Sequence, residues 1–577
     1  MIESLDLHIG DSPDSAPLQI KPGPITVFIG PNNSGKSLLL RELGATITGQ
    51  SASLLRTTIA LHYTPLSQYQ SGRPQQPLKI LREIHFTKPT SIQKLKAELI
   101  TLGGYEFENR FLTPPQHTLI NTDHDLSEGR WLDKSFFEFE QNQSDAQSIL
   151  LATAFIMLDG ETRLSLVKSK KTAPLSGSPK SILQALFTDE ESRRRLGKLT
   201  FEAFNFYAVI DPTEMRRFHI RMSTKLPSDT EEESSLSVRA RDFYRQTIDI
   251  MNMSDGVKAY TGLLAALLSR RHRIITIDEP EAFLHPALAR RLGVELSRLA
   301  TEQQANVFAS THSADFLMGC IESGHSIQIV RLTYQEGIAT AKHLSSTEIT
   351  NLMRNPLLRT TNVLSALFHT GAVVTESEAD RAFYDEINHR LQSTNGTGVS
   401  GASFLFAQNK QTTHMIVRPL RQLGIPTAAI VDMDFIKDGG KNFTNLLSAA
   451  GIPDDWHQSL GSAKAKIQDS LDKISLDWKR LGGISLLSGS QARACLDFFE
   501  SLEGYGIFVV PVGELEGWLS HLNAPKSKHS WLYKIFEKMG SDPAASGYER
   551  PAENDVWAFM RRVASWLQNP HRKGMYY

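Results

Sequence analysis

Cysteine is almost absent from this sequence. Its 577 residues include only Cys320 and Cys495, too few for a disulfide framework or a zinc site, so we expect a reducing compartment. No apolar run approaches the roughly 18 residues of a membrane-spanning helix, and no basic segment precedes an apolar run at the start of the chain. The formal net charge of -1 excludes a uniformly basic nucleic-acid coat, although it leaves room for a local basic groove. We therefore expect a cytoplasmic protein without membrane contact.

The length predicts more than one domain, since single hydrophobic cores stop growing at about 250–300 residues. With 38 glycines and 26 prolines, the composition excludes collagen-like and low-complexity classes. Short apolar runs, each followed by a loop, predict α/β domains with largely parallel sheets. These runs lie at 25–29, 274–277, 305–309, 372–374, 428–431 and 507–511.

A polar, helix-like stretch after His343 separates the first three runs from the last three. We place a boundary near residue 355 and predict domains at 1–355 and 356–577. Turn-rich and acidic, serine-rich stretches flank the helix-like residues 182–197, so we interpret about 170–239 as a helical insertion into the first domain.

The first run leads directly into a glycine-rich loop that matches the pattern G-x-x-x-x-G-K-[ST], and a helix-like segment follows at 38–43. In this pattern the glycines let backbone N–H groups surround phosphates, the lysine reaches the β- and γ-phosphates, and the serine hydroxyl holds Mg²⁺. The sequence therefore predicts an ATP and Mg²⁺ site made by Gly30, Asn32, Asn33, Ser34, Gly35, Lys36 and Ser37.

Two acidic residues follow the run at 274–277. Asp278 would hold Mg²⁺ through water, and Glu279 would polarise the attacking water. Acidic residues that favour a helix N-terminus are the simpler alternative, but the position downstream of a P-loop favours the catalytic pair.

Residues 275–286, ITIDEPEAFLHP, resemble the Walker B and D-loop region of ABC-type ATPases of the SMC/Rad50/OLD branch. Residues 310–313, STHS, resemble their switch-histidine loop, which implies that His312 senses the γ-phosphate. Residues 253–257, MSDGV, resemble their signature loop and keep Ser254 and Gly256, which face the γ-phosphate in that family. Because the signature loop of one subunit completes the site of another there, the resemblance implies that the ATPase domains dimerise.

Acidic residues follow each of the three runs of the second domain. Glu376 ends the first run, and a helix beginning there would place Asp380 on the same face, four residues later. Asp432 and Asp434 extend the second run, where side-chain alternation would point both carboxylates the same way. A third pair follows the last run: Glu514 and Glu516.

Open α/β sheets bind ligands at the carboxyl ends of their strands. Because clustered carboxylates repel one another unless cations lie between them, these residues predict a divalent-metal site. A pair of Mg²⁺ or Mn²⁺ ions there would activate water and stabilise the leaving oxygen in phosphodiester cleavage.

The order of these motifs resembles the Rossmann-like TOPRIM domain that topoisomerases, primases and OLD-family nucleases share. Residues 374–384, VTESEADRAFY, are similar to the first motif of the OLD type. The resemblance also implies a late lysine that stabilises the pentavalent phosphate. By position the candidates are Lys534 and Lys538, with Lys526 and Lys528 also in range.

An N-terminal ABC ATPase joined to a C-terminal TOPRIM domain is the architecture of OLD (overcoming lysogenization defect) endonucleases, including nuclease subunits of phage-defence systems. The resemblance implies an ATP-regulated, metal-dependent DNA endonuclease that uses ATP and Mg²⁺ or Mn²⁺ and assembles as a homodimer or homotetramer. A helicase, a reverse transcriptase with its DNA, or a toxin is a candidate defence partner.

Two alternatives remain open. In one, the protein is an ATP-dependent scaffold or sensor that holds a toxin or a reverse transcriptase with its DNA, and its TOPRIM domain is structural. In the other, weaker alternative it is a primase or topoisomerase, although neither a catalytic tyrosine context nor a zinc module is apparent. The basic clusters that could contact phosphates lie at 193–195, 216–217, 270–273, 561–562 and 572–573, the last two beside Trp557 and Trp566.

Overall fold

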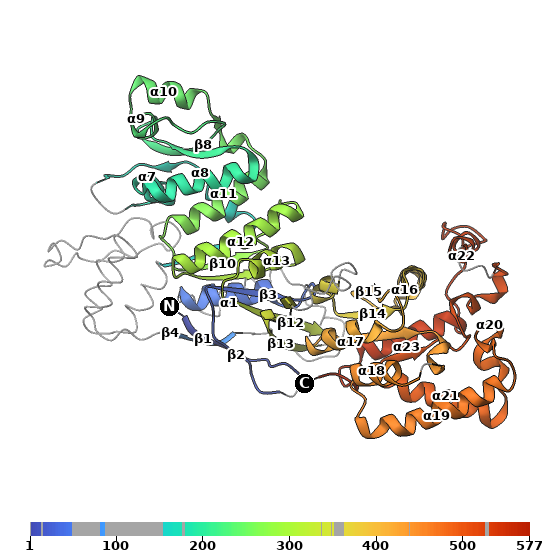
Figure 1. Ribbon diagram of the computed structural model, residues 1–577. Coiled ribbons are helices and arrows are strands. Elements are labelled where there is room, and N and C mark those ends of the chain that lie inside the picture. The colour runs from blue at the N-terminus through green and yellow to red at the C-terminus, as the bar shows by residue number, and fades with distance from the viewer. Residues whose placement is uncertain are drawn as a thin grey trace, which may run out of the picture. The chain divides into compact units, whose positions relative to one another are not determined.

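The computed structural model describes most of the chain (Figure 1), namely residues 2–12, 15–48, 81–86, 154–175, 179–335, 337–347, 349–350, 363–437, 439–525 and 530–576. The chain divides into two compact units. The first comprises Met1–Gly10, Ser15–Ile29 and Gly35–Leu332, and the second comprises Asp11–Asp14, Gly30–Ser34 and Thr333–Tyr577. The boundary predicted near residue 355 falls within 351–362, outside the described residues, and stays a prediction.

The strand that precedes the P-loop lies inside a six-stranded sheet of order β13-β12-β3-β11-β10-β5. The neighbours from β12 to β5 pair in parallel, and every residue of β3 is buried, as expected for an apolar strand covered on both faces. The three strands predicted in the first domain are confirmed to within one residue. The bounds are β3 (Ile25–Ile29), β5 (Phe155–Leu158), β10 (Ile274–Asp278), β11 (Asn306–Ser310), β12 (Ile327–Gln335) and β13 (Ile338–Leu344).

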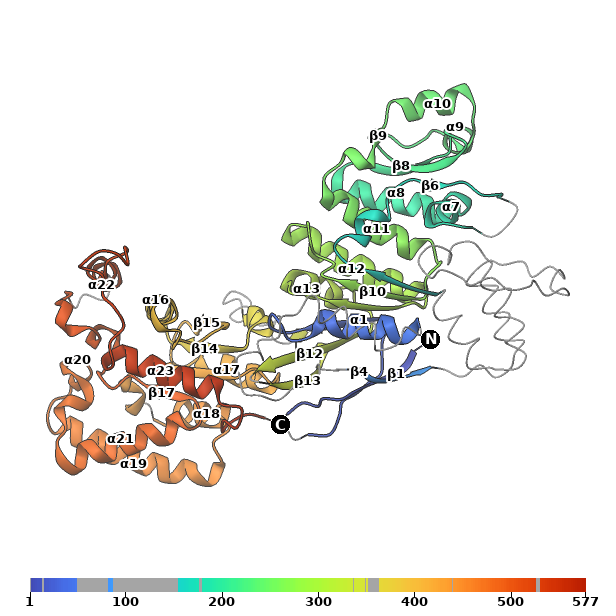
Figure 2. The ribbon, with the colours of Figure 1, turned by 180° about the vertical axis from the view of Figure 1, so that it is seen from behind.

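Helices of the first unit surround this sheet, and α11, α12 and α13 lie side by side in both ribbon views (Figure 2). A separate antiparallel sheet joins three strands near the N-terminus, in the order β2-β1-β4. The bounds are β1 (Ile2–Leu7), β2 (Gln19–Ile20), α1 (Lys36–Ile47), β4 (Leu81–Phe86), α6 (Thr162–Ser165), α11 (Asp255–Leu268), α12 (Pro286–Glu302) and α13 (Ala314–Glu322).

The expectation of a helical insertion at about 170–239 is only partly right, because antiparallel strands accompany its helices. Buried and less buried residues alternate along β8, but its charged side chains obscure this pattern in the sequence. The single helix expected at 182–197 is two, since Asp189 ends the first and caps the second by accepting a hydrogen bond from Ser192 N. The bounds are β6 (Lys170–Lys171), α7 (Ile182–Thr188), α8 (Glu190–Phe204), β7 (Tyr207–Asp211), β8 (Arg217–Ser223), α9 (Thr230–Ser234), α10 (Val238–Arg245) and β9 (Ile248–Asp249).

The second unit contains a four-stranded sheet of order β15-β14-β16-β17, in which every printed neighbour pair is parallel. The sheet confirms the predicted α/β class. The bounds are β14 (Gly371–Thr375), α16 (Glu378–Asn395), β15 (Ala402–Phe406), α17 (Thr413–Gln422), β16 (Thr427–Val431), α18 (Lys441–Ala449), α19 (Asp454–Asp472), α20 (Trp478–Leu481), α21 (Gly489–Glu503), β17 (Ile507–Val509), α22 (Trp531–Met539) and α23 (Asp555–Gln568). Among the described residues, no helix is both long and apolar enough to cross a membrane.

The aromatic residues expected to support nucleic-acid binding near the C-terminus belong to the core of this unit instead. Trp557 is 1% exposed and Trp566 is 7% exposed, and the indole of Trp566 donates a hydrogen bond to Gly504 O. The neighbouring Arg562 pairs with Glu503. Trp557 and Trp566 are therefore not available to stack on bases, because α23 turns its apolar face toward the sheet.

Arg421, on α17, is a fully buried arginine that contacts backbone carbonyls rather than a carboxylate. Burial lowers the pKa of its guanidinium to about 9. The carbonyl oxygens that accept its hydrogen bonds belong to Thr427, Ala450, Tyr505 and Gly574. Arg421 thus fixes the start of β16, which leads into the acidic D-x-D motif.

We expect Arg421→Leu to lower the free energy of unfolding of the second unit by about 3 kcal/mol or more, because each buried carbonyl left without a donor costs about 1–3 kcal/mol. Urea denaturation followed by tryptophan fluorescence measures this. The control Arg418→Leu changes an exposed position of the same helix and should alter stability by about 0.5 kcal/mol at most. Equal effects of the two changes would contradict this role.

Candidate functional site

The loop between β3 and α1 has the backbone geometry of an anion-binding turn. Gly30 (φ 139°), Asn33 (φ 61°) and Gly35 (φ 90°) all have positive φ, which glycine tolerates best and asparagine better than most residues. Gly35 directly precedes α1. The first N–H groups of a helix have no partner within the helix, so they are available to a phosphate.

Three of the residues predicted to contact the phosphates and Mg²⁺, namely Lys36, Ser37 and Asp278, lie in the first unit. Lys36 is 5% exposed, and burial lowers the pKa of its ammonium to about 8 against the opposing effect of Asp278 and Glu279. Ser37 Oγ donates to Asp278 Oδ1 at 2.9 Å, and the Ser310 hydroxyl donates to the same oxygen. Ser37 and Asp278, the two predicted Mg²⁺ contacts, are thus neighbours.

Glu279 and His312 follow adjacent parallel strands. Glu279 has φ 52°, and its N–H donates to Ser310 O at 2.9 Å. Burial and the positive charge of Lys36 lower the pKa of His312 to about 4, so its imidazole is neutral near pH 7. The backbone N–H of His312 donates to Glu281 Oε1 at 2.9 Å, which links the switch-histidine loop to the Walker B turn.

The predicted signature-loop residues lie at the start of α11. Ser254 is its exposed N-cap residue. A Cβ on Gly256 would lie 2.6 Å from Phe283 O, so glycine is needed for close packing against the turn after Walker B. This packing within one subunit explains why a glycine stands at position 256. A role of Ser254 and Gly256 in the ATP site of a partner subunit stays a prediction.

Arg163 is a residue of this site that no sequence motif indicates. It lies on α6, is 1% exposed, and donates from Nη1 to Glu279 O and from Nη2 to Asp278 O, both at 2.6 Å. Its Nε donates to Asp159 O at 2.9 Å. The guanidinium therefore fixes the backbone of both Walker B carboxylate residues.

We expect Arg163→Met to lower kcat for ATP hydrolysis by about 10–100-fold with little change in KM, because a small displacement of a catalytic group is enough to cost that much. Steady-state hydrolysis assays measure both constants. Arg163→Lys should recover part of the rate, and Arg245→Met, at an exposed position of the same unit, should have no effect. An unchanged kcat in folded Arg163→Met protein would contradict the positioning role.

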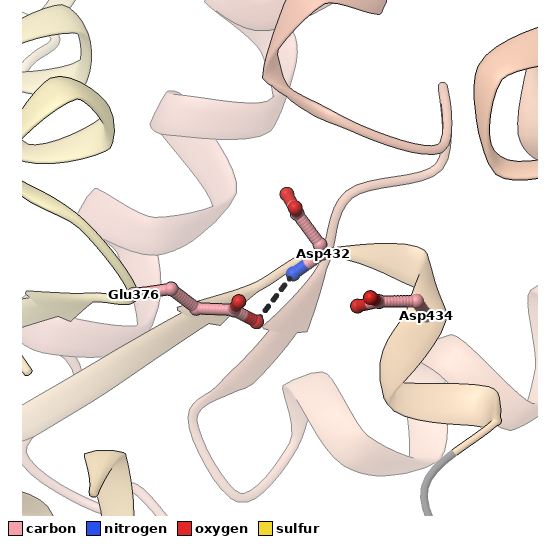
Figure 3. A group of neighbouring side chains, drawn as sticks. All are labelled: Glu376, Asp432 and Asp434. Atoms are coloured by element: carbon pink, nitrogen blue, oxygen red, sulfur yellow. Dashed lines mark hydrogen bonds between the residues drawn. The ribbon is translucent and has the colours of Figure 1, made fainter. Parts of the chain in front are cut away.

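Three carboxylates converge in the second unit (Figure 3). One oxygen each from Glu376, Asp432 and Asp434 lies within 4.8 Å of the other two. Glu376 follows β14, and the two aspartates follow its neighbour β16. Glu376 Oε1 accepts a hydrogen bond from Asp432 N at 3.0 Å. The parallel pairing of the two strands therefore brings the two motifs together.

The local backbone at these motifs differs from the expectation. Asp432 does not extend β16 but precedes the 3₁₀ turn η4 (Met433–Ile436), so alternation along a strand does not align the aspartates. Helix α16 begins only at Glu378, because Ser377 caps it: Asp380 N donates to Ser377 Oγ at 3.2 Å, and Ser377 N donates to Asp380 Oδ2 at 2.9 Å. Asp380 thus shares no helix face with Glu376.

Lys479, which no sequence motif indicates, pairs with this cluster. Its Nζ lies 2.8 Å from Asp432 Oδ2, 3.2 Å from Asp434 Oδ2 and 4.0 Å from Glu514 Oε2. Burial acts to lower the pKa of Lys479, but the charges of Asp432 and Asp434 raise it overall. A protonated amine therefore stands beside the carboxylates. Lys410 adds a second cation, 3.4 Å from Asp434 Oδ2.

The short helix α20 holds Lys479 in place. Its buried Trp478 donates from the indole to Asp472 Oδ1 at 2.8 Å. Gly513, with φ 100°, lies against the same segment, and a Cβ there would be 2.0 Å from Lys479 O. The glycine directly before Glu514 is the sequence feature that permits the backbone of Lys479 to approach this closely.

The other predicted residues of the second unit lie apart from the three-carboxylate cluster or at its edge. Glu514 is 7% exposed, and Glu516 is half-buried in η6 (Leu515–Gly517). Lys534 and Lys538 are exposed on α22, where Lys534 Nζ lies 3.5 Å from Glu537 Oε2. In the part of the chain that the structure describes, neither lysine pairs with the cluster. Lys526 and Lys528 lie outside the described residues.

The donor set fits a hard divalent cation, because it consists of carboxylate oxygens. Asp434 Oδ1 is buried and has no hydrogen-bond partner among the described residues. Burial and the charges of Asp432 and Asp434 raise the pKa of Glu376 to about 8, and burial and Asp432 raise that of Asp380 to about 7. These carboxyl groups thus lie close enough together to favour taking up protons when no cation lies between them.

These pKa values predict how metal stabilisation depends on pH. Folded protein keeps a proton on Glu376 that the unfolded chain releases near pH 4.5, so stability without metal falls as pH rises from about 4.5 to about 8. A bound cation removes this penalty. We expect Mg²⁺ or Mn²⁺ to raise the melting temperature more at about pH 8.5 than at about pH 6, and Glu376→Gln to lose most of this difference. Equal shifts at both pH values in the unaltered protein would contradict the raised pKa.

A protein-family comparison identifies the N-terminal part of the chain. Residues 25–319, more than half of the chain, match the AAA_21 family model, described as "AAA domain, putative AbiEii toxin, Type IV TA system". The chain belongs to this family. AAA_21 membership identifies the matched residues as an ATPase domain and implies ATP binding. No curated protein matches the chain.

Solved structures similar to this AAA_21 protein include SMC head domains. An SMC head bound to the C-terminal winged-helix domain of ScpA is 14% identical with a TM-score of 0.34, and the match covers 61% of this chain and 99% of that one. The SMC head domain from Thermotoga maritima is 12% identical with a TM-score of 0.29, covering 60% and 99%. An SMC head bound to the C-terminal domain of ScpA from Pyrococcus furiosus is 13% identical with a TM-score of 0.31, covering 61% and 98%. Nothing about activity or partners follows from likeness at this level.

Proposed function

We propose that this AAA_21 ATPase is an ATP-regulated, divalent-metal-dependent DNA endonuclease that acts in defence against phage. The proposal rests on one observation above all. Glu376, Asp432 and Asp434 present oxygens within 4.8 Å of one another, and the Lys479 ammonium lies 2.8 Å and 3.2 Å from the two aspartates.

The chemistry of these side chains suits phosphodiester hydrolysis. Glu376, Asp432 and Asp434 would hold Mg²⁺ or Mn²⁺, which supplies an activated water and neutralises charge on the phosphate. Lys479 would donate from Nζ to a phosphate oxygen and stabilise the extra negative charge of the transition state. In this proposal Lys479 takes the role that the family resemblance implies for a late lysine, for which Lys534 and Lys538 are the candidates by position.

ATP would act through the first unit. Lys36 and Ser37 would bind the phosphates and Mg²⁺, while Asp278, Glu279 and His312 would support hydrolysis. Ser254 and Gly256 would complete the site of a second copy, so we also propose a homodimer or homotetramer as the active assembly.

A cleavage assay tests the proposal. Purified protein is incubated with supercoiled plasmid, single-stranded DNA or RNA, with Mg²⁺ or Mn²⁺, and with or without ATP. We expect metal-dependent cleavage of DNA whose rate responds to ATP, and Lys36→Ala should remove that response without altering the metal requirement. Absence of cleavage under every condition would overturn the proposal and favour a scaffold that holds a toxin or a reverse transcriptase with its DNA.

A further inference from the structure

A cleft in the first unit is lined by four cations and, among the described lining residues, by no carboxylate. Its volume is about 830 Å³, which lies in the range of small-molecule sites. The segments that border it include β5, β6 and the start of α7, the last two labelled together in Figure 2. Its cations are Lys170, Lys171, Lys180 and Arg271.

The positive charge at β6 is concentrated rather than neutralised. Strand β6 pairs with β8, where Lys171 lies opposite Arg217. Burial and the positive charges of Lys168 and Arg217 lower the pKa of Lys170. Neither Lys170 nor Lys171 pairs with a carboxylate in the described part of the chain. Such a group of like charges in a partly enclosed space attracts anions.

The remaining lining of the cleft is mainly apolar. Met157, Leu166 and Ile182 contribute to it, and the last two are 6% and 7% exposed. His272 also lines the cleft, and its buried Nδ1 has no hydrogen-bond partner among the described residues. An apolar wall beside cations favours a ligand that has a flat, weakly polar body and negatively charged groups.

We propose that this cleft binds a phosphate-bearing ligand of nucleotide size, with its phosphates on Lys170 and Lys171 and its base against the apolar wall. The site is separate from the P-loop, since none of the P-loop or Walker B residues lines the cleft. Two sources share this chemistry: a free small nucleotide and the end of a nucleic-acid strand. The proposal goes beyond the nuclease function, because it concerns residues of the first unit alone.

Fluorescence anisotropy tests the site with two labelled probes, the dinucleotide pApA and a single-stranded DNA 12-mer. The full-length chain carries Asp432→Asn to suppress cleavage and Lys36→Ala to weaken nucleotide binding at the P-loop, because added ATP would itself compete for the cleft. We expect at least one probe to bind with a dissociation constant below about 1 mM. Binding of both probes that depends on Lys170 and Lys171 indicates a free nucleotide as sufficient ligand. Binding of the 12-mer alone with the same dependence identifies a nucleic-acid strand as the source, since DNA held at the proposed nuclease site would not need these two lysines.

Paired variants separate this site from general surface charge. Lys170→Gln with Lys171→Gln should weaken binding at least tenfold, and the corresponding Arg pair should restore it. The matched control, Lys198→Gln with Lys225→Gln, removes two exposed lysines of the same unit and should leave binding unchanged. Lys180→Gln, at an exposed position of the rim, should also weaken binding, and this second test leaves β6 unaltered. The proposal is overturned if neither probe binds below about 1 mM, or if the control pair weakens binding as much as the cleft pair.

Discussion

Glu376→Gln and Asp432→Asn are each expected to lower the rate of metal-dependent DNA cleavage by about 1,000-fold or more, since each removes a charged oxygen from the set that would hold the cation. ATP binding and hydrolysis should be unchanged, because Lys36, Ser37 and Asp278 belong to the first unit. Single-turnover plasmid cleavage and nucleotide-binding assays on the same preparations measure the two activities separately.

Glu516→Gln is the matched control for these changes. The sequence placed Glu516 among the metal ligands, but the group of converging oxygens consists of Glu376, Asp432 and Asp434. We therefore expect Glu516→Gln to reduce cleavage by less than about tenfold. Cleavage at the unaltered rate by Glu376→Gln would contradict the proposed site, and a loss in Glu516→Gln equal to that in Asp432→Asn would place the cation elsewhere.

The parts of the fold that could be predicted are those with local signals. Apolar runs such as 25–29 are buried strands because such residues favour the interior of a parallel sheet, and the P-loop pattern marks the turn that follows. The approach of Glu376 to Asp432 also follows from sequence, since both motifs end strands and the carboxyl ends of neighbouring parallel strands lie at one edge of a sheet.

The parts that could not be predicted depend on tertiary packing. Lys479 reaches Asp432 because Trp478 is buried and Gly513 admits the backbone of α20, and nothing in the sequence around Lys479 specifies that contact. Arg163 likewise acts through hydrogen bonds to the carbonyls of Walker B residues, which leave no pattern of residue types. Trp557 is the opposite case, in which the sequence suggested a nucleic-acid contact that the structure does not show. An aromatic residue beside arginines suits a buried helix face as well as a surface that stacks on bases.

Lys479→Met is expected to reduce DNA cleavage by about 100–1,000-fold, the effect of removing one preorganised charge from a transition state. Lys479→Arg should retain part of the rate, because it keeps the charge but not the geometry. The control is Lys534→Met, which alters an exposed lysine that was a candidate for the catalytic lysine by its position in the sequence. This variant should cleave DNA at the normal rate. Single-turnover rates at saturating metal give this comparison.

A second readout separates a role in catalysis from one in holding the fold together. Lys479 Nζ now occupies the space beside Asp432 and Asp434, at 2.8 Å and 3.2 Å, so it competes with any divalent cation for the same oxygens. Lys479→Met should therefore bind Mn²⁺ more tightly in calorimetric titration even though it cleaves more slowly. Weaker Mn²⁺ binding together with lost cleavage would indicate that the substitution disrupts the metal site itself. Normal cleavage by Lys479→Met with loss of cleavage in Lys534→Met would show that Lys534, on α22, is the lysine that stabilises the phosphate. Tighter Mn²⁺ binding together with slower cleavage is the result expected if the Lys479 ammonium acts on the phosphate rather than holding the fold together.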